Sequence, residues 1–77
     1  MRLGKAINEM VSVKRSSHKR LAEQIGQKYG SAIGNIVIRN NCNVDTLLDI
    51  ASVLEYDLIL KPKGNFGNTM VLTKGGD

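Results

Sequence analysis

The segment from Ser17 to Leu48 constrains the fold most, because it divides into short helices separated by residues that end or begin helices. Apolar residues spaced three or four positions apart predict one buried stripe for each helix. The expected stripes are Leu21, Ala22 and Ile25, then Ile33, Ile36 and Val37, and finally Val44, Leu47, Leu48, Ala51 and Leu54. The sequence therefore predicts a small bundle of short helices.

Capping residues stand at the expected helix ends. Ser17, Ser31 and Asn43 are predicted N-caps of the three helices, because their side-chain oxygens can accept a bond from a free amide of the first turn. Gly26 suits a left-handed residue that ends the first of these helices, and Asp45 lies in the first turn of the last one, where it favours the helix dipole.

The helix expected after Ser31 has a competing interpretation. Residues 36–38 are β-branched and Gly34 costs about 1 kcal/mol relative to alanine in a helix, so this stretch could also be a strand. We expect a packed helix, because helix signals flank the segment on both sides.

The two ends of the chain complete the predicted fold. Leu3, Ala6, Ile7, Met10 and Val11 share one helical face, and this first helix should fade near Val13. Residues 56–61 read as a strand ending at Pro62, 64–68 as a turn and 69–73 as an antiparallel return, while 74–77 should fray. The expected fold is mainly α, with a four-helix domain over 1–55 and a C-terminal β-hairpin over 56–74.

Charge is distributed unevenly along the chain. Residues 1–39 carry eight Lys or Arg against two Glu, a balance of +6, whereas residues 40–77 have a balance of −2. The cationic half contains the central helices, and a one-sided positive field favours association with a phosphate backbone. Two short helices joined by a tight turn are also how a helix-turn-helix places one exposed helix against DNA, so double-stranded DNA is the expected partner.

Other function classes have little support in the composition. No apolar run is long enough to span a bilayer, the N-terminus lacks the apolar core of a signal peptide, and we expect a cytoplasmic protein with no membrane partner. Cys42 is the only cysteine and His18 the only histidine, so no internal disulfide, metal site or cofactor is expected. Cys42 is interpreted as an inert loop residue rather than a redox sensor, and no catalytic constellation supports an enzyme.

Several of these positions resemble a known family. Leu3–Gly4, Leu21–Ala22, Ile25–Gly26, Ile33, Ile36 and the run 43–48 resemble the lambda-repressor/Cro-like (XRE-type) helix-turn-helix proteins, over about Leu3 to Leu54. The family usually has Gln at the first position of its second helix, where this chain has His18. The family's fifth helix is replaced here by a strand.

The resemblance implies that the helix after Ser31 enters the major groove. Ser31, Ala32 and Asn35 are then the base-reading candidates by position, while Lys19, Lys28 and Arg39 are phosphate contacts. His18 either contacts a phosphate or is an ordinary solvated residue, with the contact preferred. Tyr29 could stack on or bond the DNA backbone, but is expected instead to plug the turn.

The predicted function is a sequence-specific, dimeric DNA-binding regulator of the repressor type. The rival is a protein-interaction module on the same fold, such as an antitoxin that binds a partner toxin. The hairpin is the expected dimerisation element, through Leu58, Ile59, Leu60, Met70, Val71 and Leu72, because both of its faces are apolar. The alternative is a hairpin folded against its own helices in a monomer.

Overall fold

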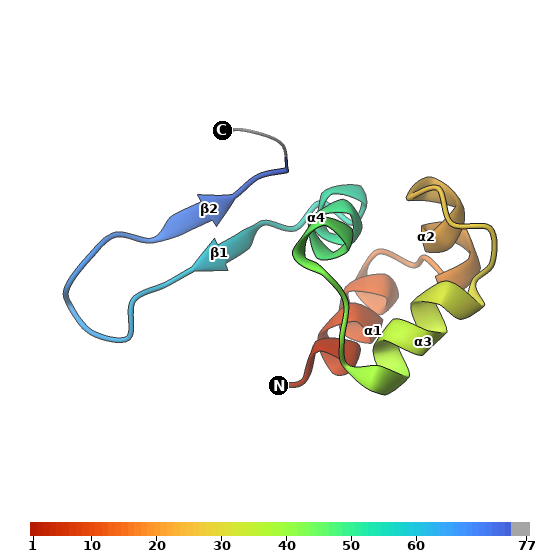
Figure 1. Ribbon diagram of the computed structural model, residues 1–77, viewed down its shortest axis with the longest axis horizontal. Helices are drawn as coiled ribbons and strands as arrows, with labels where there is room; N and C mark the ends of the chain where they lie inside the picture. The colour runs from red at the N-terminus through yellow and green to blue at the C-terminus, as the bar shows by residue number, and fades with distance from the viewer. Residues whose placement is uncertain (75–77) are drawn as a thin grey trace.

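The computed structural model describes residues 1–74 and is mainly helical, with one small antiparallel sheet at its C-terminal end (Figure 1). The elements, in chain order, are α1 (Leu3–Val13), α2 (His18–Gln24), α3 (Ser31–Arg39), α4 (Val44–Val53), β1 (Leu58–Leu60) and β2 (Met70–Leu72). The helices pack together, and the two strands extend away from them beyond α4.

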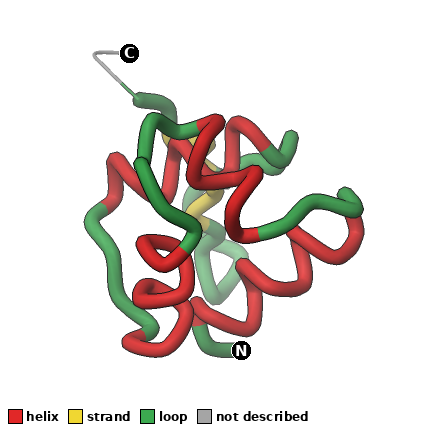
Figure 2. The backbone as a smooth tube through the Cα atoms, turned by 90° about the vertical axis from the view of Figure 1, so that its right-hand side faces the viewer, coloured by secondary structure: helices red, strands yellow, loops and turns green. Residues whose placement is uncertain are grey.

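The hydrophobic core is formed by residues of all four helices and the residues that end them, and Figure 2 shows how these helices are arranged. Its members are fully or nearly fully buried: Ile7, Val11, Leu21, Ala22, Ile33, Ile50 and Leu54. The stripes predicted for α1, α2 and α3 are confirmed, with every stripe residue buried or half-buried. Residues 36–38 are helical, so the strand interpretation is wrong, and burial of Ile33 with half-buried Ile36 and Val37 supports that helix.

Each of the four helices in residues 1–74 ends with a left-handed residue. Arg15, Gly26, Asn40 and Glu55 have φ angles of 52°, 83°, 54° and 62°. The next amide in each case donates to a carbonyl five residues back, at N···O distances of 2.9, 2.8, 3.3 and 2.8 Å. These bonds satisfy carbonyls that the helix itself leaves free. The role predicted for Gly26 is confirmed.

Two predicted N-caps are confirmed and one is wrong. Ser17 Oγ accepts from the Arg20 amide at 3.1 Å, and Asn43 Oδ1 accepts from the Thr46 amide at 2.8 Å. Ser31 is not a cap, because α3 begins one residue earlier than expected, with Gly30 at the N-cap position. The carbonyl of Tyr29 accepts from the Ala32 amide at 3.0 Å and so serves the first turn.

The first turn of α1 lies directly against the last turn of α3. The Gly4 amide donates to Asn40 Oδ1 at 2.9 Å. A Cβ atom at Gly4 would overlap the carbonyl oxygen of Val37, so the two backbones approach this closely only because residue 4 has no side chain. This contact sets how closely, and in which orientation, α1 and α3 pack against each other.

Helix α4 packs on two sides. Ile50 and Leu54 belong to the helical core, whereas Leu48 faces the hairpin and lines a cleft beside it. The stripe predicted for this helix is therefore wrong at one end: Val44 is 58% exposed, because it starts the helix beyond the edge of the core. Ile50, which that stripe omitted, is fully buried.

The hairpin is antiparallel as predicted, with Leu58 opposite Leu72, Ile59 opposite Val71 and Leu60 opposite Met70. Its strands are shorter than the expected 56–61 and 69–73. One reason is that the Tyr56 amide bonds the Ala51 carbonyl at the end of α4, which leaves it unavailable to a strand.

The end of the chain was expected to fray from residue 74. Lys74 is instead held by its side chain, since Nζ donates to Asp49 of α4 at 3.0 and 3.1 Å. The expectation for residues 75–77 lies outside the described residues.

Candidate functional site

The exposed face of α3 is the first part of the candidate site. With Ile33 buried and Ile36 and Val37 half-buried, Ser31, Asn35, Ile38 and Arg39 are left exposed. Ser31, Asn35 and Ile38 are spaced i, i+4 and i+7, so they lie in one line along the outward face of the helix. That line is about 10 Å long, at 1.5 Å of rise per residue.

Sequence reasoning missed Ile38 as part of this face. Its side chain is 79% exposed, the most exposed isoleucine or leucine in residues 1–74. A signal was available, because a run of three β-branched residues cannot place all three on one side of a helix. Ile36 and Val37 turn toward the core, and Ile38 must then turn away from it.

The N-terminal part of α2 supports the start of α3. A Cβ atom at Gly30 would lie 3.0 Å from both Cα and N of Lys19, so glycine allows the two backbones to approach closely. This contact brings Lys19 beside the first turn of α3. Because Gly30 is the N-cap, the Ser31 hydroxyl makes no capping bond and lies exposed in that turn.

His18 joins the start of α2 to α1 through a side-chain hydrogen bond. Its Nε2 lies 2.8 Å from Asn8 Oδ1 of α1, and Nε2 donates this bond because an amide oxygen can only accept. The ring is half-buried, and the absence of a side chain at Gly34 leaves room beside Nδ1. The side chain is thus partly ordered by α1, and whether it contacts a phosphate stays a prediction. Since Nε2 is engaged, a phosphate bond through Nδ1 requires the protonated ring.

Tyr29 does not plug the turn between α2 and α3. It is 64% exposed, and Lys28 Nζ lies 5.8 Å from the centre of its ring. Ile25, half-buried against the core, provides the apolar contact at the end of α2 instead. The tyrosine ring is thus free to meet a ligand together with the Lys28 ammonium group.

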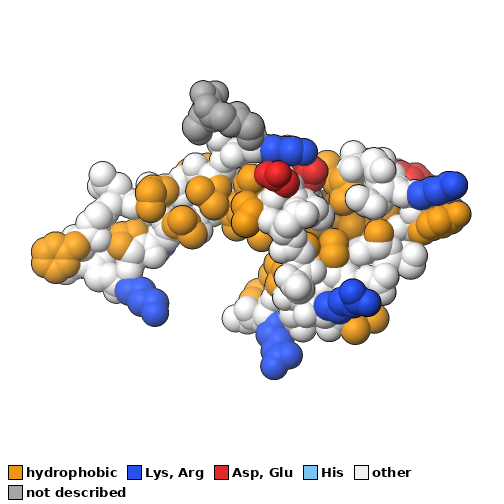
Figure 3. Space-filling model, viewed as in Figure 1, with side chains coloured by type: hydrophobic (Ala, Val, Ile, Leu, Met, Phe, Trp, Pro, Cys, Tyr) orange, Lys and Arg blue, Asp and Glu red, His pale blue; other side chains and the backbone are white. Residues whose placement is uncertain are grey.

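The segment of the chain that contains α3 carries charge of one sign. No Asp or Glu occurs from residue 24 to residue 44, whereas Lys28 and Arg39 lie at either end of α3 and are exposed. Figure 3 shows Lys and Arg side chains projecting from the lower edge of that view, below the hairpin and the helices, without acidic side chains beside them. Ala32 is half-buried, so it contributes less surface than the other predicted contacts.

The hairpin forms a second exposed surface. Ile59, Leu60, Met70 and Val71 are exposed on its two faces, and only Leu58 and Leu72 are half-buried. Phe66, in the connecting turn, is 91% exposed. An apolar arm of this kind leaves much of its surface in contact with water.

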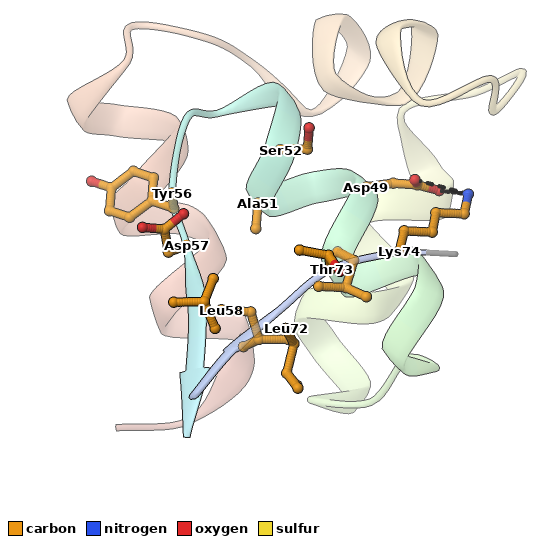
Figure 4. Close-up of a pocket in the computed structure, with 11 residues that line it drawn as sticks. Asp49, Ala51, Ser52, Tyr56, Asp57, Leu58, Leu72, Thr73 and Lys74 are labelled. Carbon is orange, nitrogen blue, oxygen red and sulfur yellow. Dashed lines mark hydrogen bonds and ion pairs between the residues drawn. The ribbon is translucent and has the colours of Figure 1, made fainter. Parts of the chain in front are cut away.

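A cleft of about 380 Å³ separates this arm from α4 (Figure 4). Leu58 and Leu72 point into it from the strands, Ala51 lies on the α4 side, and the Asp49–Lys74 ion pair lies at one end. The hydrogen bond to Asp49 raises the pKa of Lys74, so its ammonium stays charged across the neutral range. The ion pair ties the end of β2 to α4.

Two further features of residues 1–74 are the grouping of possible metal ligands and the environment of the Cys42 thiol. Within residues 1–74, no three His, Cys, Asp or Glu side chains gather in a group that could hold a metal ion. Burial raises the pKa of the Cys42 thiol, which lowers the thiolate fraction and hence its reactivity. None of the helices in residues 1–74 is long and apolar enough to cross a lipid bilayer.

Comparison with known proteins gives no match to any family model, curated protein or solved structure. The functional conclusion therefore depends on the geometry and chemistry of this chain.

Proposed function

We propose that the protein is a sequence-specific DNA-binding regulator, in which α2 and α3 form a helix-turn-helix unit and α3 enters the major groove. The observation that carries the proposal is the exposed line on α3, placed between Lys28 and Arg39 on a segment without acidic residues. A helix fits the major groove in width, and cations beside it neutralise phosphates on either side.

Roles follow from the chemistry of the exposed groups. Asn35 carries an amide that can bond an adenine edge through both its donor and its acceptor, and Ser31 can bond several bases. Lys19, Lys28 and Arg39 would position the protein on the backbone without reading sequence. Tyr29 would bond or stack on the same backbone.

The arrangement of the helices supports a lambda-repressor-like architecture for this unit. The positions that resemble that family have structural roles here: Leu21 and Ala22 are buried in the core, Gly26 ends α2 and Asn43 caps α4. The close contact at Gly4, which orients α3, lies at another of these positions.

A dimer formed through the hairpin completes the proposal. The arm presents apolar side chains on both faces, and an isolated two-stranded hairpin is marginally stable in water. Pairing with a second copy would cover these side chains. The two copies of α3 would then be related by a two-fold axis and lie about 34 Å apart, one turn of DNA. A palindromic DNA site is then expected.

The apolar arm also supports a second candidate function. A surface containing exposed Ile59, Met70 and Phe66 could bind a different protein, as in an antitoxin that holds its toxin through one end and DNA through the other. In this candidate the hairpin serves the partner protein rather than a second copy.

The salt dependence of DNA binding tests the proposal. Three backbone cations in each of two chains would release about six counterions, so log K should fall with log[salt] at a slope of about −5. Affinity for duplexes of random sequence and for the DNA flanking the protein's own gene should be measured from 50 to 200 mM salt, where about a thousandfold loss is expected. Absence of binding to every duplex at about 50 mM salt would favour the protein-interaction candidate.

A further inference from the structure

The position of Ile38 on α3 extends the proposed function to a specific base. Ile38 lies in the same outward line as Ser31 and Asn35, one turn beyond Asn35. It makes no contribution to the core, since 79% of its surface is exposed.

We propose that Ile38 reads thymine through its 5-methyl group, and this inference rests on the proposed DNA-binding function. The isoleucine side chain has no donor or acceptor, so it cannot bond a base edge. The thymine methyl is the apolar group that base pairs display in the major groove, and apolar side chains make contact with it there. The 10 Å line on α3 spans about three base pairs, which allows Ser31, Asn35 and Ile38 to face successive positions.

The surroundings of Ile38 favour DNA over an apolar protein surface as its partner. Its exposed neighbours on α3 are polar or cationic: Ser31, Asn35 and Arg39. A protein-binding patch would need adjoining apolar side chains, which this face of α3 does not supply. Arg39, next in sequence, carries a guanidinium group suited to the adjacent phosphates.

Deoxyuridine tests the inference, because it pairs as thymidine does but lacks the methyl group. The full-length protein is first used to select a preferred site from random duplexes. Each thymidine of that site is then replaced singly by deoxyuridine, and Kd is measured by fluorescence anisotropy at constant salt. Loss of one methyl contact should weaken binding about fourfold, and loss of the symmetric pair in both half-sites about fifteenfold.

The variant Ile38→Ala should remove this discrimination, so that thymidine and deoxyuridine sites bind equally. The change removes exposed atoms only, and the melting temperature should stay within a few degrees of wild type. Val13→Ala is the matched control, since Val13 is also exposed but lies at the end of α1, and it should keep the wild-type ratio.

Equal binding to thymidine and deoxyuridine sites by the wild type, or a ratio unchanged in Ile38→Ala, would overturn the role of Ile38 while leaving DNA binding intact. Absence of binding to any duplex would instead overturn the proposed function, and the inference with it.

Discussion

Two glycines lie in helices, Gly4 in the first turn of α1 and Gly34 in the middle of α3, and the structure predicts opposite effects when each is replaced by alanine. Alanine is favoured over glycine by about 1 kcal/mol in a helix interior, and it also restricts the unfolded chain. A Cβ atom at Gly34 would meet only His18 Nδ1, at 4.0 Å, which is ordinary contact. Gly34→Ala should therefore stabilise the protein by about 0.5–1 kcal/mol and raise Tm by several degrees.

Gly4→Ala should destabilise the protein in spite of the same helix preference. The new Cβ would overlap the Val37 carbonyl oxygen and lie 2.9 Å from the Val37 carbonyl carbon, and backbone atoms cannot rotate away. Overpacking of this kind costs about 1–3 kcal/mol. Weakening of the Gly4 bond to Asn40 adds about 1 kcal/mol. The net loss should be about 1–3 kcal/mol, or at least about 5 °C in Tm.

Thermal and urea unfolding followed by far-UV circular dichroism would measure both variants. The two proteins and the wild type must be compared at one protein concentration, because the proposed dimerisation would make Tm concentration-dependent. A Gly4→Ala protein as stable as the wild type would show that α1 and α3 do not approach this closely. A destabilised Gly34→Ala protein would show that the surface beside His18 is not open.

Three further predictions concern the exposed face of α3, a helix end and the hairpin. Asn35→Ala should reduce the binding free energy for the preferred DNA site by about 1–3 kcal/mol and relax discrimination between DNA sequences. Lys28→Ala should weaken binding to all duplexes similarly. An equal loss of affinity of Asn35→Ala for specific and for random DNA would contradict base reading. Glu55→Gly should raise the free energy of unfolding by about 0.5–1 kcal/mol in urea titrations, because residue 55 is left-handed with φ of 62°. Ile59→Lys should dissociate the proposed hairpin dimer in sedimentation equilibrium, while Val13→Lys, at another exposed apolar position, should leave it intact. A wild type that stays monomeric at high concentration would refute hairpin pairing.

Local chemistry in the sequence was sufficient for the order and type of the elements. The 3.6-residue periodicity predicts α1 to α3, and the caps at Ser17 and Asn43 and the left-handed residue at Gly26 form because they depend on residues within one helical turn. The exposed positions of Asn35 and Arg39 were predictable for the same reason, since one face of α3 must be buried.

Features that depend on contacts between distant elements were not predictable. Ile50 is buried in the helical core while Leu48 lines the cleft beside the hairpin, and a single apolar stripe does not describe a helix with two partners. Tyr29 is exposed, and the apolar contact near the end of α2 comes from Ile25, which packs against the core. The bond between His18 and Asn8 joins residues ten positions apart and depends on how α1 lies against α2.

The sequence by itself determined where the helices and strands form, because periodicity, caps and turn residues act over a few neighbouring positions. Only the tertiary structure decided what several of those residues do. Gly4 and Gly34 are both glycines of predicted helices, yet the backbone of α3 packs against the first, whereas open space lies beside the second. Tyr29 reads as an apolar plug for the turn in the sequence, yet the structure leaves it 64% exposed. The physical reason is that packing depends on which elements meet, a property that no short segment of the chain contains.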